Sequence, residues 1–386
     1  MIDRWLSRAW DAITSLKLTI VLLALLMVLV VGCTLAQVEM GTFGAVKAFM
    51  RSFFVWWAVP GTGWEIAILP GGALVGLVLA VNLLAAQGRR LELSWKKSGL
   101  WIAHAGLILL IAGEFVSAVF QIDTRMAIEE GQTVNYVESP REMELVVKDV
   151  TDPRYDDVYG VSESLLSRGG TIPVPGTPLS LRVKAYLQNA DLRMRGPQDP
   201  PGPATMGVGT GVLLAPLPPV TSDDDINRSA ALVEPVAGGQ SYGTWLVSNA
   251  LGAPQSFIHE GRTYVLSMRS RRIYLPYSLT LKKFSHDVYA GTDIPKNFSS
   301  LVHLSNRSTG EERDVLIYMN QPLRYDGKTF YQASFGKGDT LSILQVVQNP
   351  GWLLPYVACA LVTLGLVVHF AITMRRGPRR GAVLEA

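Results

Sequence analysis

Residues 100–120 read LWIAHAGLILLIAGEFVSAVF, an apolar run that is long enough to cross a bilayer as a helix. Its ionisable side chains are those of His104 and Glu114. A group that can carry charge is costly inside hydrocarbon, so its presence there indicates a function. The sequence therefore predicts a membrane span whose histidine has a role to be explained.

Three other windows have the same length and apolar character: residues 18–36, 66–86 and 352–373. Of the 386 residues, 48% are hydrophobic and 17% charged, which is too apolar for an ordinary soluble protein of this size. We therefore expect an integral membrane protein with four transmembrane α-helices. Residues 121–350, between the third and fourth helices, are of ordinary polarity and long enough for a large folded domain.

Basic residues mark one side of these spans: Arg4, Arg8, Lys17, Arg89, Arg90, Lys96, Lys97, Arg375, Arg376, Arg379 and Arg380. By contrast, the link between the first two spans holds Lys47 and Arg51. The positive-inside rule then places residues 1–17, 87–99 and 374–386 in the cytoplasm, and residues 37–65 and 121–350 outside it. The net charge of +3 gives no reason to expect a nucleic acid partner.

Residues 37–65 carry an aromatic cluster: Phe43, Phe49, Phe53, Phe54, Trp56 and Trp57. We expect a weakly amphipathic helix along the outer interface of the bilayer, with stacking on a flat ligand as the alternative. The second span opens at Pro70 and contains Asn82, which is expected to hydrogen-bond a neighbouring helix.

The two cysteines, Cys33 and Cys359, both fall in predicted spans toward their outer ends. A bridge between them is conceivable, but two buried small hydrophobic residues are the favoured interpretation, and a redox role is left open. The basic start of the first span and its Cys33 also resemble a lipoprotein signal, although the apolar run continues to Ala36 and favours a retained helix. Without a Cys-x-x-Cys motif, thiol oxidoreductase chemistry by this chain alone is not expected.

From residue 121 the pattern changes to short alternating runs bounded by turn signals, which predicts a β-rich domain. Candidate strands cover residues 142–150, 179–187, 262–268, 277–284, 314–319, 329–334 and 342–347. Residues 196–225 are rich in proline, glycine and acidic side chains, so we expect an extended or mobile insertion there, and a candidate boundary between two subdomains.

His104 lies near the cytoplasmic end of the third span, and His369 lies at a similar depth in the fourth. Neutral imidazole is a common ligand of haem iron, so two such histidines could hold one iron. The alternatives are a hydrogen bond to a neighbouring helix, snorkelling to the interface, or a proton relay with Glu114. Glu114 is ten residues, about 15 Å, further along the helix than His104.

At helical spacing, Gly106 and Gly113 mark a different face of the third span from His104, and Ala358, Val362 and Gly365 form a small strip beside His369. The remaining histidines, His259, His286 and His303, have no metal-ligand spacing and are expected at the surface.

Two stretches carry a resemblance to a known family: FSHDVYAGTDIPKNFSSLV at residues 284–302 and MNQPLRYDGKTFYQASF at residues 319–335. With the Asn349-Pro350-Gly351-Trp352 run and the order of spans, the chain resembles the ResB family, also called Ccs1 or CcsB, of System II cytochrome c biogenesis proteins. The resemblance implies a bacterial plasma (inner) membrane protein. It also implies a ResC/CcsA-type membrane partner that, with this chain, carries haem outward and attaches it to apocytochrome c.

By the same resemblance, His104 is the expected axial ligand of a transient haem b, and His369 a weaker candidate. The partner's tryptophan-rich signature is absent, since Ala58 follows Trp56-Trp57, so the chain is expected to be one half of the machine and not an enzyme alone. The alternative is a membrane-anchored extracytoplasmic binding or scaffold protein with structural histidines in its spans.

Overall fold

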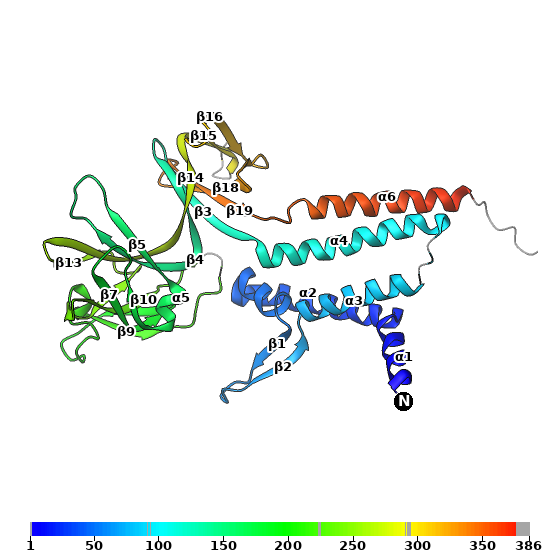
Figure 1. Cartoon of the computed structure of the whole chain (residues 1–386), viewed down its shortest axis with the longest axis horizontal. Helices are drawn as coiled ribbons and strands as arrows, with labels where there is room; N and C mark the ends of the chain where they lie inside the picture. Colours follow the sequence, from blue (N-terminus) through cyan, green and yellow to red (C-terminus); the bar gives the residue numbers. More distant parts are fainter. Residues whose placement is uncertain are drawn as a thin grey trace, which may run out of the picture. The chain divides into compact units, whose positions relative to one another are not determined.

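The computed structural model of the chain describes residues 2–90, 92, 94–222, 225–289, 291 and 295–375. They divide into two compact units, each described by itself. The helical unit takes the described residues of 1–122, 221–223 and 348–386, and the β unit those of 123–220 and 224–347 (Figure 1). Several predicted features fall outside the described residues: Arg376, Arg379, Arg380 and the rest of the C-terminal segment, Asp223 and Asp224 in the insertion, and Ala290 and residues 292–294 in the 284–302 stretch.

Within the described residues, four helices are long and apolar enough to cross a membrane, as the sequence predicts. They are α2 (Leu16–Ala45) with the π-helical turn η1 (Val46–Met50), α3 (Gly72–Arg90), α4 (Ser98–Phe120) with the 3-10 turn η2 (Trp95–Lys97) before it, and α6 (Leu354–Arg375). A short helix that was not predicted, α1 (Ile2–Ile13), precedes them. The helix of the first span is longer than predicted, since it passes residue 36 and kinks at Gly41, where φ is 67°.

Asn82 ties α3 to the junction of α1 and α2. Its side chain is 1% exposed, accepts from the Thr19 hydroxyl at 2.6 Å and donates to the carbonyls of Ile13 and Ser15. Arg89, about two turns further along α3, donates to the Thr14 hydroxyl at 2.8 Å. These contacts confirm the predicted helix-to-helix hydrogen bond, because a buried amide needs partners in protein when water is excluded.

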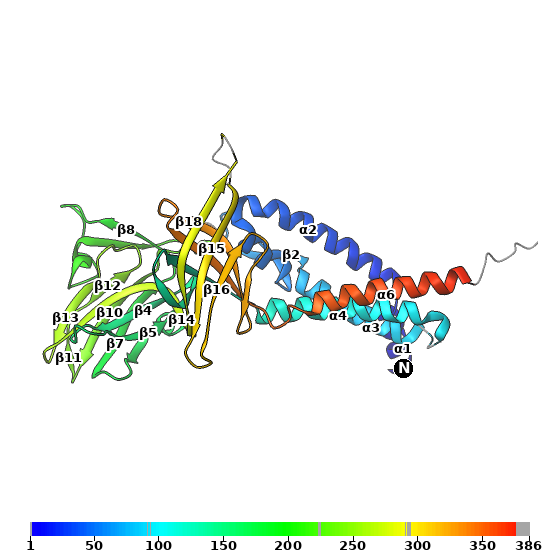
Figure 2. The same cartoon turned by 90° about the horizontal axis from the view of Figure 1, so that it is seen from above.

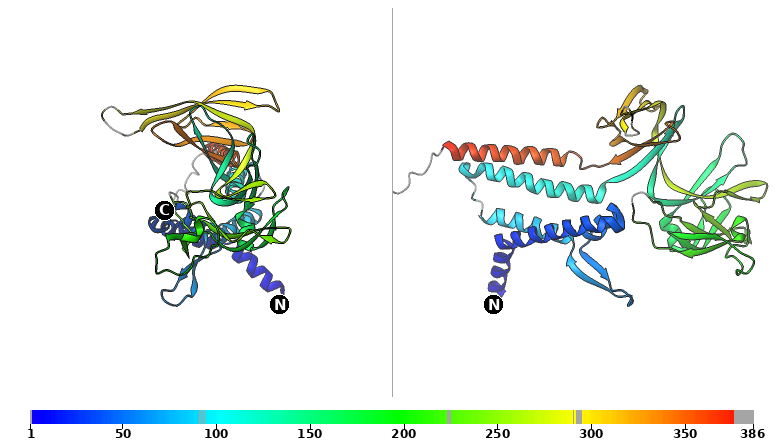
Figure 3. Two further views of the ribbon diagram at one scale, coloured as in Figure 1. Left: turned by 90° about the vertical axis from the view of Figure 1, so that its left-hand side faces the viewer. Right: turned by 180° about the vertical axis from the view of Figure 1, so that it is seen from behind.

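Helices α4 and α6 run antiparallel and side by side (Figures 1 and 3). Their contact is made by small residues: a Cβ on Gly106 would lie 2.8 Å from the Ala358 carbonyl oxygen, and one on Gly113 would lie 2.9 Å from the Leu354 side chain. A Cβ on Gly365 would overlap the backbone of Ala103. The two backbones therefore touch directly, as in other small-residue helix pairs of membranes. We call this contact the α4–α6 seam.

The aromatic segment differs from the prediction. Residues that were expected to be helical instead form a hairpin of β1 (Phe54–Ala58) and β2 (Glu65–Pro70), so the second span begins at Gly72 and not at residue 66. The run FVWWA is rich in aromatic and β-branched side chains, which favour strands, and Pro60-Gly61-Thr62-Gly63 provides the turn. Pro70 also disfavours helix at the residue before it.

The β unit follows α4 and precedes α6 in the sequence. One ten-stranded sheet has the order β16 (Glu311–Tyr318), β15 (Pro295–Asn306), β14 (Arg262–Val288), β4 (Thr133–Asp149), β3 (Ile122–Glu129), β19 (Leu341–Gln348), β18 (Lys328–Gly336) and β17 (Leu323–Tyr325). Strands β13 (Gln255–His259) and β5 (Asp157–Ser162) add to β14 and β4. Strands β14 and β4 are the longest of the unit, with 27 and 17 residues, and both are labelled in Figure 2.

Two cores form along these two strands. The first contains Leu145, Leu181, Val233 and Tyr264 among its buried residues, and the second contains Ile128, Leu281, Val302 and Phe330. The first core is completed by α5 (Glu163–Arg168) and a smaller sheet of β6 (Gly170–Pro173), β7 (Leu179–Leu187), β10 (Ala230–Ala237), β11 (Gln240–Ser241) and β12 (Trp245–Ser248). The unit is therefore β-rich, as predicted, with two lobes that share β4 and β14.

The insertion at residues 196–225 does not separate these lobes. It contains the 3-10 turn η3 (Val208–Gly211) and β9 (Val212–Pro216), which pairs with β8 (Ala190–Met194). Ala204 and Val212 join Leu246 in a third buried cluster, and the Val208 amide donates to the Gln255 side chain at 3.0 Å. Its proline and glycine content suggested a mobile segment, and the contacts could not be predicted because their partners, Leu246 and Gln255, are distant in the sequence.

The seam can be tested with two glycines. We expect Gly365→Ala to lower the unfolding free energy by about 1–3 kcal/mol, because the added methyl group forces α6 away from the Ala103 backbone. Gly76→Ala in α3 is the matched control, since its Cβ meets nothing within 4 Å. Thermal unfolding in detergent measures both, and equal midpoints for the two variants would contradict the seam.

Asp149 in β4 makes the β unit sensitive to acid. Burial by itself raises the pKa of this carboxyl group, but hydrogen bonds from Thr151 and Arg262 outweigh it and hold the pKa below the ordinary value. A carboxylate with a lowered folded-state pKa stabilises the fold above its unfolded pKa of about 3.9, and this contribution is lost as the pH falls below it.

We therefore expect Asp149→Asn to lower the unfolding midpoint at neutral pH and to flatten its decline from about pH 5 to pH 2. Denaturant unfolding at a series of pH values measures this, with the exposed Asp157→Asn as the control. If the unfolding midpoint of Asp149→Asn fell as steeply with decreasing pH as that of the wild type, the Asp149 contacts would make no contribution to the acid sensitivity.

Candidate functional site

His104 lies in the second turn of α4 and its imidazole has a defined tautomer. Nδ1 is 2.8 Å from the carbonyl oxygen of Leu100, one turn earlier in the helix. A carbonyl oxygen can only accept, so Nδ1 is the donor, and in the neutral ring Nε2 keeps its lone pair. Nε2 makes no hydrogen bond within the described part of the chain, and the side chain is partly buried.

This arrangement fits a metal ligand. Histidines that bind metals usually donate their other ring N–H to a carbonyl or carboxylate, which fixes the ring and raises the basicity of the ligating nitrogen. The residues around His104 in α4 are mostly apolar, as the surroundings of a haem usually are. His104 is therefore compatible with haem, and Nε2 is the atom that would bind the iron.

His104 points away from α6. Successive α-helical residues are rotated by about 100°, so Gly99, Ala103, Gly106 and Gly113 form a strip about 80° wide on α4. These are the residues that contact α6 or would overlap it. By the same rotation, His104 is about 140° from the middle of that strip. Its side chain therefore faces the space on the opposite side of α4.

His369 has the opposite placement. It shares one strip of α6 with Ala358, Val362 and Gly365, and a Cβ on Gly99 would overlap its backbone. Its Nδ1 is buried and has no partner among the described residues. His369 thus belongs to the α4–α6 seam, whereas His104 lies on the face of α4 that points away from the seam.

Glu114 is exposed on α4 and has no hydrogen bond or ion pair within the described residues. Gly113 packs against Leu354 at the first turn of α6, so Glu114 lies near the end of the helix pair that is far from His104. This separation leaves the proton relay between them without a direct contact. The cysteines form no disulfide: Cys33 is buried, as the favoured interpretation has it, whereas Cys359 is exposed on α6.

Two of the three histidines of the β unit are not surface residues, contrary to the prediction. The His259 side chain is 10% exposed and its Nδ1 is 2.5 Å from the Tyr242 hydroxyl. The His286 side chain is 12% exposed and pairs with Asp339 at 3.2 Å. His303 pairs with Asp314 and is more exposed. The sequence contained no signal that these histidines are buried, because the partners come from segments outside the strands that carry them: Tyr242 follows β11, and Asp339 lies in the turn between β18 and β19.

His286 also packs on an aromatic cluster. Its ring lies 4.3 Å from that of Phe335, which in turn contacts Phe284 and Phe298. Its Nδ1 pairs with Asp339, and its Nε2 is buried without a partner within the described residues. No group of three or more His, Cys, Asp or Glu side chains that could hold a metal ion occurs in the described part of the chain.

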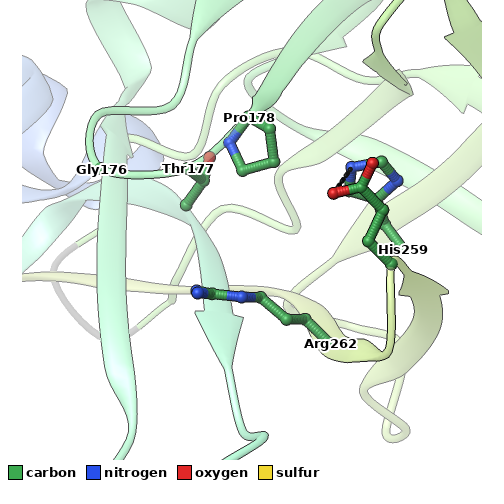
Figure 4. Close-up of a pocket in the computed structure, with 6 residues that line it drawn as sticks. Gly176, Thr177, Pro178, His259 and Arg262 are labelled. Carbon is green, nitrogen blue, oxygen red and sulfur yellow. Dashed lines mark ion pairs between the residues drawn. The ribbon is translucent and has the colours of Figure 1, made fainter.

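A shallow cavity of about 430 Å³ opens in the first lobe of the β unit (Figure 4). It lies between the turn at residues 176–178 and the hairpin that joins β13 to β14, and its lining includes His259 and Arg262. Arg262 already pairs with Asp149, and His259 already bonds Tyr242. Arg262 and His259 thus already have partners within the protein, and we assign no ligand to this cavity.

The part of this chain that matches a known family lies in the β unit. The family model of the ResB-like family matches residues 242–343. Protein NrfI of Wolinella succinogenes is 35% identical to this chain over 102 residues, which are 26% of this chain and 11% of NrfI. The matching part thus spans about a tenth of the length of that relative.

The match includes both stretches on which the resemblance rests, residues 284–302 and 319–335. These stretches provide part of β14, most of β15, and β17 and β18, which surround the second core. His104 and His369 lie outside the matched residues. The resemblance to the ResB family is thus confirmed over residues 242–343.

Proposed function

We propose that this chain is the membrane subunit of a System II cytochrome c synthetase. In this role it helps to carry haem across the bacterial inner membrane and to present it with apocytochrome c for covalent attachment. A ResC/CcsA-type membrane protein is the proposed partner. The ResB-like match and the similarity to NrfI support a role in cytochrome c biogenesis.

The observation that carries the haem part of the proposal is the free Nε2 of His104. The Nδ1–H donates to the Leu100 carbonyl, so the neutral ring presents the Nε2 lone pair and does not have to reorient before it binds iron. When bound, haem supplies the iron that this lone pair coordinates and the vinyl groups that become attached to apocytochrome c. The chain's own contribution is to bind and orient the haem, with His104 on a helix that the seam holds rigid.

The second axial ligand comes from a group outside α6 in this proposal, because His104 faces away from that helix. A partner histidine is the first choice. His369, the weaker candidate from the sequence, is not used in this proposal, because it lies on α6 in the seam.

A scaffold role is the alternative function. The β unit contains most of the described residues, and an intramembrane histidine that bonds only its own helix is compatible with a structural role. The haem content of the purified protein separates the two functions, because a scaffold has no reason to bind haem through His104.

We expect His104→Ala to reduce haem that co-purifies with the chain and its partner by at least about tenfold, since even the loss of a supporting hydrogen bond at a metal site costs that much. Added imidazole should restore the absorbance by occupying the space of the missing ring. His369→Ala is the matched control, and we expect it to retain haem because its side chain lies in the seam. Unchanged haem in His104→Ala, with normal maturation of c-type cytochromes, would reject the ligand role and favour the scaffold.

The charge distribution predicts that the β unit is extracytoplasmic and that both termini are cytoplasmic. Alkaline phosphatase, which folds only outside the cytoplasm, should therefore be active when inserted in the exposed turn at residues 250–253 and inactive at the C-terminus. The opposite pattern would place His104 at the outer end of its span and remove it from the side where haem enters.

A further inference from the structure

The β1–β2 hairpin leaves large aromatic side chains uncovered. Trp56 is 58% exposed, Trp57 50% and Trp64 73%, and Ile66 and Ile68 are each at least half exposed. Figures 1 and 3 show the hairpin extending away from α2 and α3, between which it lies in the sequence. No other described strand pairs with it. An isolated two-stranded hairpin is at best marginally stable in water, so this one needs a covering environment.

The base of the hairpin is fixed on the helices. Val55 is 3% exposed and belongs to a cluster with Leu22, Leu29 and Val75 of α2 and α3. The Gly71 amide donates to the Phe53 carbonyl at 2.8 Å, and a Cβ on Gly71 would overlap Ser52, so only glycine permits this close approach. The hairpin is thus held at one position along α2 and α3, while its outer part stays uncovered.

Both faces of the hairpin are apolar. Consecutive strand residues point to opposite faces, so Trp56 and Trp57 lie on different sides of the ribbon. Trp57 pairs with Ile66 across the strands, and Trp56 pairs with Ala67. A protein that docks on one face would leave the other tryptophan in water. A surrounding medium covers both.

We propose that the hairpin lies in the bilayer interface, between headgroups and acyl chains, at the end of the α2 and α3 spans. Two observations favour lipid as the occupant. The hairpin is continuous with apolar spans on both sides, since one candidate span ends at Met50 and the next begins at Gly72, and Glu65 is the only ionisable residue in the sequence 52–70. Tryptophan rings, with an apolar body and one N–H donor, are enriched at this depth.

The backbone sets how deep the hairpin can go. Its outer strand edges have no partner in the described structure, and unpaired N–H and C=O groups cannot enter hydrocarbon without a large cost. Headgroups and interfacial water can satisfy them. This placement depends on α2 and α3 being membrane spans but not on haem binding, so it stands or falls independently of the proposed function.

Fluorescence in reconstituted vesicles tests the proposal. The hairpin emission is the difference between the full-length wild type and the W56F/W57F/W64F variant. We expect this emission to be blue-shifted and strongly quenched by lipids brominated near the headgroup, and less quenched by lipids brominated near the chain ends. Trp245, which is 4% exposed in the β unit, gives the control through W245F, and its emission should not respond to brominated lipid.

Equal hairpin emission in brominated and unbrominated vesicles would overturn the proposal. So would quenching by added haem without quenching by lipid, which would assign the tryptophans to a flat ligand instead. Should the triple variant fail to fold, W64F alone gives the same readout, because Trp64 is the most exposed of the three and makes no contribution to the buried cluster at the base.

Discussion

The contact between the backbones of α4 and α6 determines what the helical unit can do. Gly99, Gly106 and Gly365 leave no room for a side chain, so the two helices cannot rotate relative to each other without a clash. This fixes the rotation of α4, and with it the direction of His104. In hydrocarbon the hydrophobic effect does not drive helices together, so such close packing of small residues is the main source of specificity. The direction of His104 is therefore a consequence of the glycines on the other side of its helix.

The same contact separates the two intramembrane histidines. From the sequence they share depth and apolar surroundings, which makes one iron between them an attractive hypothesis. The seam places His369 among the residues that pack on α4 and turns His104 outward. In the proposed function, a second ligand of the iron would therefore come from outside α6, which gives a physical reason for the proposed partner. Depth can be read from position in a span, but direction requires knowing which face is covered.

The sequence predicted the elements that depend on local composition. The four apolar windows became helices, and strand 179–187 coincides with β7. The prediction failed where distant residues decide: residues 262–268 and 277–284 were expected as two strands, whereas they belong to the single strand β14, which pairs with β4 between Tyr264 and Thr280. Pro276 lies between them where the register with β4 shifts, and a proline inside a sheet is typical of such a bulge. His104 was singled out from the sequence as a candidate, but its hydrogen bond to Leu100 and the direction of its side chain could not be predicted.

The hairpin shows a further limit of reading aromatic residues. A window such as FFVWWAV has the composition of an interfacial segment whether it is helical or extended, because the interface selects side chains and not backbone conformation. The choice between helix and strand depends on whether the backbone N–H and C=O groups find hydrogen-bond partners within the segment. The chain returns after the Pro60-Gly61 turn with Ile66, Ala67 and Ile68, which provide the partner strand, so the extended form is available and the β propensity of the aromatic residues prevails. A turn between two apolar runs was the signal that distinguishes the two forms.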